Sequence, residues 1–464
     1  MANDFWRLGA GGLSDAYARE EACPVQVIAE LRDRIARLNH GINAYAVLAP
    51  DLEAQAEESA SRLRQGRARS PLEGVPVALK DNLVMRGLPA AWGGEVFGAV
   101  QSRDELPVQR LRAAGAILTG KTTCPEFAVE GYTASRKFGI TRNPWNPDLT
   151  PGGSSGGAVA AVAAGLAAAA LGTDGGGSIR RPAGHTGLFG LKPTIGAIPR
   201  HGGLPQILMD FEVAGPLARS ARDLRLMFGV LTGTDRSDPA SRGHRPEAPA
   251  RRSLKVLYVE QFGDSPCDPA IRRAARGAAD LLASLGHEVA AGPLPFDLEP
   301  LDRFWGSFAQ IGLAHLAVTV PAMAERASPQ YLEMAANGRG IPARDLFAAL
   351  EEVRRLRAAV SQAFGEWDVI MTPAAAAQPW PAGEAYPPLI DGQAAGPRGH
   401  AVYTGWVNAS GHPGLAVPVQ PDAAGLPVGI QLVGDLHSED LLLSLGEEME
   451  LASSGWHWPR YALG

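Results

Sequence analysis

Apolar residues follow two rhythms along the first half of the chain. One is the three- and four-residue spacing of an amphipathic helix, seen in Ile28, Leu31, Ile35 and Leu38. The other is the short uninterrupted apolar run that is typical of a buried strand. The predicted helices cover residues 24–39, 51–65, 106–114 and 155–171. The predicted strands cover residues 75–79 and 116–119, so strands and helices alternate.

The second half continues this alternation with a longer helical stretch inside it. Apolar runs predict strands at residues 254–259, 368–372 and 429–433, and residues 300–365 are mostly helical by pattern. Alternating strands and helices indicate an α/β fold, a large sheet with helices on both faces. The length alone would suggest about three domains.

Composition and charge narrow the range of partners. The chain has 464 residues and a net charge of −6, and its basic and acidic residues are scattered. Without a basic stripe that could follow a phosphate backbone, we expect no nucleic-acid ligand. The one basic cluster, residues 242–252, contains two prolines and is interpreted as a solvated linker.

No segment has the pattern of a membrane anchor or a secretory signal. The most apolar run, residues 158–171, is mostly alanine and too short to span a bilayer. The N-terminus has no basic stretch followed by an apolar one. We therefore expect a cytoplasmic protein with no membrane partner. The three cysteines are too scattered for a zinc site, and no clustered histidine spacing occurs, so no metal is expected.

Two familiar patterns occur in the wrong context. Residues 115–122 match the letters of a P-loop, but the residues between its glycines would themselves form a buried strand. Residues 152–156 match the nucleophile elbow of α/β-hydrolases, but a loop precedes them where that elbow needs a strand. Neither pattern predicts a nucleotide site or a Ser-His-Asp triad, and no cofactor is expected.

A glycine-rich turn is the stronger candidate for chemistry. In Gly172-Thr-Asp-Gly-Gly-Gly-Ser178, three consecutive glycines allow backbone N–H groups to converge on one point. Such a nest could stabilise an oxyanion beside Ser178, although a simple turn explains this segment equally well when it is taken alone.

A second glycine–serine turn and a lysine could complete a catalytic set. Ser154 and Ser155 open the small-residue helix that leads to the first turn, and Ser155 could cap that helix. No histidine accompanies either turn, so Lys80, at the end of a predicted buried strand, is the candidate base. A lysine accepts a proton only if burial lowers its pKa substantially. These considerations permit the set without requiring it.

These segments together resemble the amidase signature family. The similarity covers the Lys80-Asp-Asn82 motif, residues 120–157, residues 171–183, residues 190–194 and two closing motifs at residues 408–413 and 425–433. It therefore extends over nearly the whole chain. The resemblance implies one α/β domain over residues 1–464 with a large mixed, twisted sheet, a core signature over residues 75–220 and a helical substrate-facing insert at about residues 300–365.

The resemblance also implies roles for individual residues. Ser178 would be the nucleophile, Ser154 the proton relay and Lys80 the general base. The peptide bond before Ser154 would be cis. The oxyanion hole would comprise the N–H groups of Gly175, Gly176, Gly177 and Ser178, and the supporting residues would be Ser155, Asp174 and Arg180. Gly175 departs from the family, where Thr or Ile is more usual.

The predicted reaction is hydrolysis of the C–N bond of a small aryl or alkyl amide. An ester or carbamate hydrolase with the same triad is one alternative. The glutamine-hydrolysing chain of a tRNA amidotransferase, known as its A chain, is another and would need a partner chain. Residues 131–135 and four aromatic residues of the insert are candidates for the pocket wall: Phe304, Trp305, Phe308 and Tyr331. A homodimer is left open.

Overall fold

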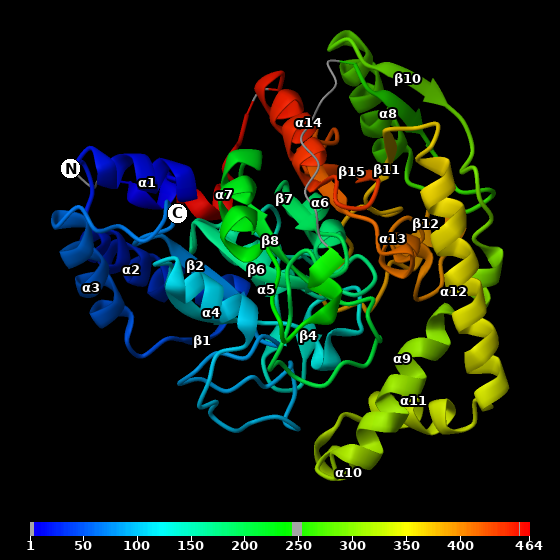
Figure 1. Ribbon diagram of the computed structural model, residues 1–464, viewed down its shortest axis with the longest axis horizontal. Helices are drawn as coiled ribbons and strands as arrows, with labels where there is room; N and C mark the ends of the chain where they lie inside the picture. Colours follow the sequence, from blue (N-terminus) through cyan, green and yellow to red (C-terminus); the bar gives the residue numbers. More distant parts are fainter. Residues whose placement is uncertain (1–3, 244–252, 454) are drawn as a thin grey trace.

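The computed structural model describes residues 4–243, 253–453 and 455–464. Most of the basic cluster at residues 242–252 therefore lies outside the described residues. The central element is an 11-stranded sheet with β1 and β10 at its edges (Figure 1). Its strands, in spatial order, are β1 (Tyr45–Leu48), β3 (Ile117–Thr122), β2 (Pro76–Lys80), β6 (Ala169–Asp174), β8 (Val213–Ala218), β7 (Phe189–Lys192), β14 (Gly414–Val419), β15 (Val428–Gly434), β11 (Val369–Pro373), β9 (Lys255–Tyr258) and β10 (Glu288–Ala291).

The sheet is mixed, as the sequence predicted. Strands β3, β2 and β6 are parallel to one another, and so are β11, β9 and β10. The strands between these two groups pair antiparallel. One continuous sheet therefore joins both halves of the chain into a single α/β domain, and the expectation of about three domains from length is wrong.

Helices cover both faces of the sheet, which is visible at β7. A Cβ atom on Gly190 would lie 3.0 Å from Ala183 of α6 (Arg180–Thr186). The neighbouring Phe189 lies on the opposite face, where a Cβ atom on Gly446 of α14 (Glu439–Leu451) would be 3.6 Å from its ring. Because successive strand residues point to opposite faces, α6 and α14 cover opposite sides of the sheet.

The other helices were largely predictable from their apolar spacing. Those before the insert are α1 (Ala10–Ala18), α2 (Pro24–Ile42), α3 (Leu52–Arg64), α4 (Leu106–Ala113), α5 (Gly156–Ala163), α7 (Ala221–Leu231) and α8 (Pro269–Ser284). The insert and the C-terminal part add α9 (Glu299–Thr319), α10 (Met323–Arg326), α11 (Pro329–Arg339), α12 (Ala343–Ala363), α13 (Gly405–Ser410) and α15 (Arg460–Leu463). Helices α9–α12 lie together at one side of the molecule, opposite α1–α3 (Figure 1).

The predicted helix over residues 155–171 is wrong in its second half. Helix α5 ends at Ala163, and β6 begins at Ala169. Between them Gly165 has a φ of +67°, a left-handed conformation that commonly terminates helices. The alanine run has no polar positions to set a period, so its pattern cannot distinguish a buried helix from a buried central strand. The glycine-rich turn accordingly starts after Asp174.

The P-loop letters belong to a strand, as predicted. Strand β3 is buried throughout, and a Cβ atom on Gly120 would lie 2.3 Å from the Val47 carbonyl oxygen. The Lys121 ammonium group donates to the Asp81 carbonyl oxygen at 2.8 Å inside the protein. This lysine is thus buried against backbone and does not face a phosphate site.

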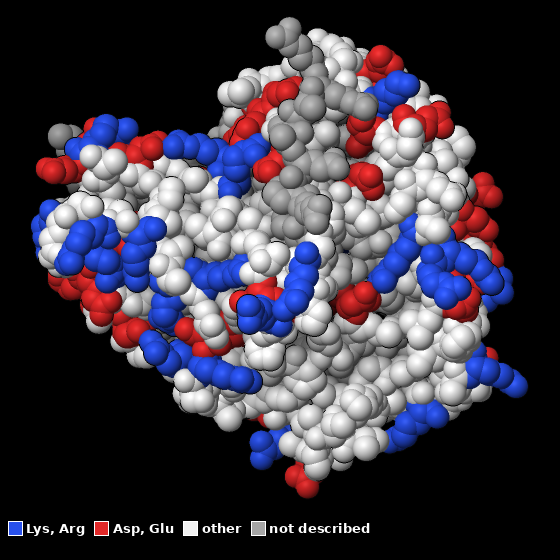
Figure 2. Space-filling model, in the orientation of Figure 1, with Lys and Arg blue, Asp and Glu red and all other residues white. Residues whose placement is uncertain are grey.

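On the face shown in Figure 2, basic and acidic side chains are interspersed. Among the described residues, no helix is both long enough and apolar enough to cross a membrane. Within the same part of the chain, no group of three or more His, Cys, Asp or Glu side chains could hold a metal ion.

Candidate active site

The candidate residues meet where two neighbouring parallel strands end. Lys80 is the last residue of β2, and Asp174 is the last residue of β6. The carboxyl ends of parallel strands lie at one edge of a sheet, which is where α/β proteins generally place their sites. Ser178 follows β6 in the turn that leads to α6.

Lys80 is completely buried and contacts only uncharged oxygens. Its ammonium nitrogen lies 2.8 Å from Ser154 Oγ, 2.9 Å from Thr173 Oγ1 and 3.3 Å from the Thr173 carbonyl oxygen. Burial lowers the pKa of Lys80 below 10.5, and the more distant carboxylates of Glu212 and Asp174 only partly oppose this. The site therefore favours a neutral amine more than a surface position would.

The turn that carries Ser154 lies directly against the turn that carries Ser178. The Gly153–Ser154 peptide bond is cis, as the family resemblance implied. The Ser155 amide donates to the Ser178 carbonyl oxygen at 3.2 Å. Ser155 occupies the cap position of α5, but its hydroxyl donates to the Thr173 carbonyl oxygen at 3.2 Å and does not cap the helix. The hydroxyl of Ser155 thus ties the two turns together.

The three glycines place a set of amides beside Ser178. The Gly177 amide donates to Asp174 Oδ1 at 2.7 Å, and Gly177 has a φ of +112°, which favours glycine. The amides of Gly175, Gly176 and Ser178 have no hydrogen-bond partner among the described residues. The Ser178 hydroxyl likewise has none, and its residue lines a cavity. Donors and hydroxyl are therefore open on the same side.

A buried ion pair fixes this turn from behind. Arg180 Nη2 lies 2.9 Å from Asp174 Oδ1, and both side chains are fully buried. Burial alone would raise the pKa of Asp174, but Arg180 and the amide of Ile179 hold that pKa well below its ordinary value. The carboxylate therefore stays ionised and accepts from the turn's amides at both ends.

Sequence reasoning missed the groups that complete this network. Asn408 Nδ2 donates to the Asp174 carbonyl oxygen at 2.8 Å, and its Oδ1 accepts from Arg180 at 2.6 Å. Gln431 Oε1 accepts from Arg180 as well. Both residues belong to the closing motifs, which was the only available signal, because they lie more than 225 positions from the turn they hold.

The cavity beside Ser178 has a volume of about 680 Å³. Of the four aromatic candidates, only Trp305 lines it. The other three belong to the apolar core: Phe308 packs on Phe211, Tyr331 packs on Phe127, and Phe304 is partly buried in the Trp305 cluster. From residues 131–135, only Gly131 reaches the cavity wall.

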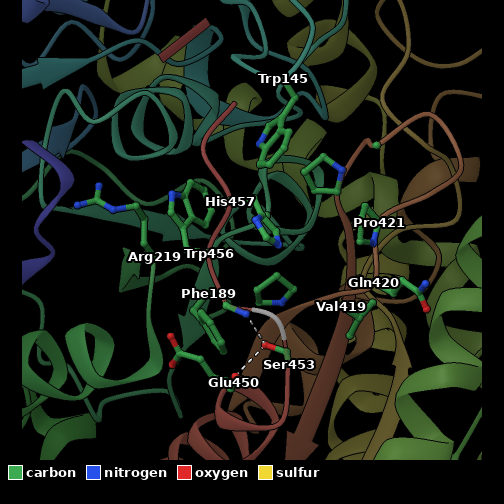
Figure 3. Close-up of a pocket in the computed structure, with 15 residues that line it drawn as sticks. Trp145, Phe189, Arg219, Val419, Gln420, Pro421, Glu450, Ser453, Trp456 and His457 are labelled. Carbon is green, nitrogen blue, oxygen red and sulfur yellow. Dashed lines mark hydrogen bonds between the residues drawn. The ribbon is translucent and has the colours of Figure 1, made fainter. Parts of the chain in front are cut away.

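A second hollow of about 520 Å³ lies away from these residues (Figure 3). Trp145, Phe189 and Trp456 form its aromatic wall. Ser453 lines it too, but no lysine does, and the Ser453 hydroxyl donates to the Glu450 carbonyl oxygen at 2.8 Å. This hollow lacks a base that could activate a nucleophile.

The comparisons with known proteins agree with the geometry. A family model described as Amidase matches residues 26–443, so the chain belongs to the amidase family and is an amidase signature hydrolase. The A chain of the glutamyl-tRNA(Gln) amidotransferase from Methylobacillus flagellatus is 31% identical to it, with 96% of each protein covered.

Solved structures show the same fold over the whole chain. The structure of a bacterial aryl acylamidase of the amidase signature family is 26% identical and superposes with a TM-score of 0.87, covering 98% of this chain and 97% of that one. A substrate complex of 6-aminohexanoate cyclic dimer hydrolase is 28% identical with a TM-score of 0.87, covering 99% of this chain and 100% of the other.

Proposed function

We propose that this protein hydrolyses the C–N bond of small amides through an acyl-enzyme on Ser178, with Ser154 as proton relay and Lys80 as base. The observation that carries the proposal is the 2.8 Å contact between the Lys80 nitrogen and Ser154 Oγ in a fully buried setting. A lysine whose pKa is lowered by burial can accept a proton through the intervening hydroxyl.

In the proposed reaction, Ser178 Oγ attacks the amide carbonyl carbon and forms a tetrahedral adduct. Its proton passes through Ser154 to Lys80, and then returns by the same route to the leaving nitrogen. The C–N bond breaks, the amine leaves, and water hydrolyses the remaining ester. The amides of Gly175, Gly176 and Ser178 are proposed to bind the oxyanion. The Gly177 amide already donates to Asp174, so its proposed share is smaller.

We propose an aryl or alkyl amide as the substrate class. The cavity is lined by Trp305 and Met334, which would contact an apolar group. Two structural relatives, described as an aryl acylamidase and as a hydrolase of a cyclic 6-aminohexanoate dimer, act on amides as their names state. The same nucleophile would also attack an activated ester or carbamate.

Glutamine hydrolysis within an amidotransferase is the second candidate, because the A chain of such an enzyme is 31% identical over 96% of this chain. Such a role requires a partner chain. Glutaminase activity that arises only when the other chains of an amidotransferase are added would favour this second candidate over the first.

The proposal is tested with a panel of anilides, primary amides, carbamates, esters and glutamine. We expect the purified chain to hydrolyse anilides and Ser178→Ala to lose this activity completely. Ser154→Ala should lower kcat roughly 100-fold or more, because it interrupts the proton path. The matched variant Ser155→Ala removes a neighbouring hydroxyl that contacts only backbone. It should change thermal stability more than kcat. Turnover that survives in Ser178→Ala would refute the assignment.

A further inference from the structure

Arg181 lies beside the proposed nucleophile and is not neutralised. It is the second residue of α6, lines the cavity and is only 6% exposed. Its Nη1 donates to the Gly176 carbonyl oxygen at 2.9 Å. Its Nε and Nη2 have no hydrogen-bond partner among the described residues, and no carboxylate there forms an ion pair with it. A buried guanidinium without a counter-ion is an unfavourable arrangement.

Arg398 brings a second cation to the same cavity. It lines the wall and remains exposed to solvent, and its guanidinium carbon lies 5.5 Å from the centre of the Trp305 ring. Within the described part of the chain, the Arg398 side chain forms neither a hydrogen bond nor an ion pair. The surrounding wall lowers the pKa of Arg398, and Asp302 only partly opposes this from a distance. Burial lowers the pKa of Arg181, and the charge of Arg398 lowers it further.

The other titratable groups of the cavity do not neutralise the two arginines. Burial lowers the pKa of His400 well below its ordinary value, so this ring is neutral at neutral pH. Burial raises the pKa of Glu130, and no basic side chain offsets that rise, so Glu130 is not paired with either arginine. The cavity thus holds two positive charges that nothing in the described protein compensates.

We infer that this cavity binds an amide whose acyl or amine half carries a carboxylate, with Arg181 and Arg398 as its partners. This inference rests on the proposed function. Guanidinium groups bind carboxylates through paired hydrogen bonds in a common plane, and such charge-assisted bonds are strong in a partly buried site. The apolar wall at Trp305 and Met334 would hold the uncharged part of the substrate.

The inference is tested with matched substrate pairs. Succinanilate against butyranilide places a carboxylate on the acyl half, and 4-acetamidobenzoate against 4-methylacetanilide places it on the amine half. We expect the wild type to prefer the charged member of one pair by at least about 10-fold in kcat/KM. Arg398→Met should reduce that ratio roughly 10- to 100-fold, and Arg398→Lys should reduce it less. The exposed Arg339→Met on α11 is the control and should leave the ratio unchanged.

Arg181→Met provides an independent variant, since it should reduce the same ratio even if it also weakens folding through Gly176. Binding of succinanilate to Ser178→Ala, measured by calorimetry, separates the two proposals. Tight binding that Arg398→Met abolishes would support the anion site even if no amide were hydrolysed. Equal kcat/KM within both pairs, or a ratio unaffected by Arg398→Met, would overturn the inference.

Discussion

Lys80 shows how a common residue acquires unusual chemistry from its position. A strand buried on both sides ends at this lysine, so its amine has no water around it. Its neighbours are hydroxyl and carbonyl oxygens, which can hydrogen bond to it but cannot neutralise a charge. Burial therefore lowers its pKa, whereas a carboxylate at the same distance would have raised it.

The pH dependence of activity should report this lysine. Only the neutral amine accepts a proton, so kcat/KM should rise with pH and level off above a pKa lower than 10.5. Lys80→Met should lose roughly 100- to 10,000-fold in kcat/KM, and the residual activity should lack the rising limb. Exposed Lys255 gives the control variant Lys255→Met, which should keep the wild-type profile. A rising limb that persists in Lys80→Met would contradict Lys80 as the base.

At this scale the sequence identified the right neighbourhood but not the contacts. Lys80, Ser154 and Ser178 were selected from glycine-rich turns, a strand end and a family resemblance. The role of the Thr173 hydroxyl as a partner of Lys80 had no signal, because a threonine inside a strand is ordinary. The unpaired charge of Arg181 was equally invisible, since pairing depends on what surrounds a side chain in space.

Among the elements, the α5–β6 connection is where apolar pattern failed and glycine geometry decided. Fourteen residues of mostly small apolar side chains divide into a helix, a turn and a strand, and only the turn has a conformational requirement. At Gly165, both the positive φ and the closeness of Trp6 exclude a side chain. This division sets the spacing between the Ser154 and Ser178 turns, which begin α5 and follow β6.

Gly165→Ala should therefore destabilise the protein for two separable reasons. A Cβ atom there would lie 2.6 Å from the Trp6 ring, in addition to the cost of a positive φ. Gly66→Ala isolates the second effect, because Gly66 has a φ of +63° and no atom within 4 Å of its Cβ position. We expect about 1 kcal/mol loss in the free energy of unfolding for Gly66→Ala and about 2–4 kcal/mol for Gly165→Ala.

Urea denaturation of both variants measures the difference. The additional Trp6→Leu substitution should recover part of the Gly165→Ala loss, because it removes the ring that the new Cβ meets. Equal losses in Gly165→Ala and Gly66→Ala would show that the close approach to Trp6 has no energetic consequence.

For the whole molecule, the fold class and the mixed sheet were predictable, because they follow from alternating elements and from the family. The long-range joints were not. Arg34 is 5% exposed and donates to the carbonyl oxygens of Ala164, Gly165 and Ala462. It joins α2 to the α5–β6 turn and to α15, across 428 positions in its longest contact. No local pattern marks an arginine on a helix as a buried joint.

Arg34→Met should consequently cost about 3 kcal/mol in the free energy of unfolding, because it leaves three buried carbonyl oxygens without their donor. Deleting residues 455–464 should destabilise the protein too, since it removes the Ala462 contact and the Tyr461 hydroxyl bond to the Leu38 carbonyl oxygen. The two changes share one contact, so the combined variant should lose about 1 kcal/mol less than the sum of the single losses.

Arg37→Met is the matched control, because Arg37 lies on the same helix and is exposed. It should unfold like the wild type in urea. If Arg34→Met and the deletion were strictly additive, Arg34 would not connect the two ends of the chain energetically. Coupling together with an unchanged kcat/KM in the folded protein would mean that this joint stabilises the domain as a whole, while the contacts of Lys80, Ser154 and Ser178 determine the chemistry separately.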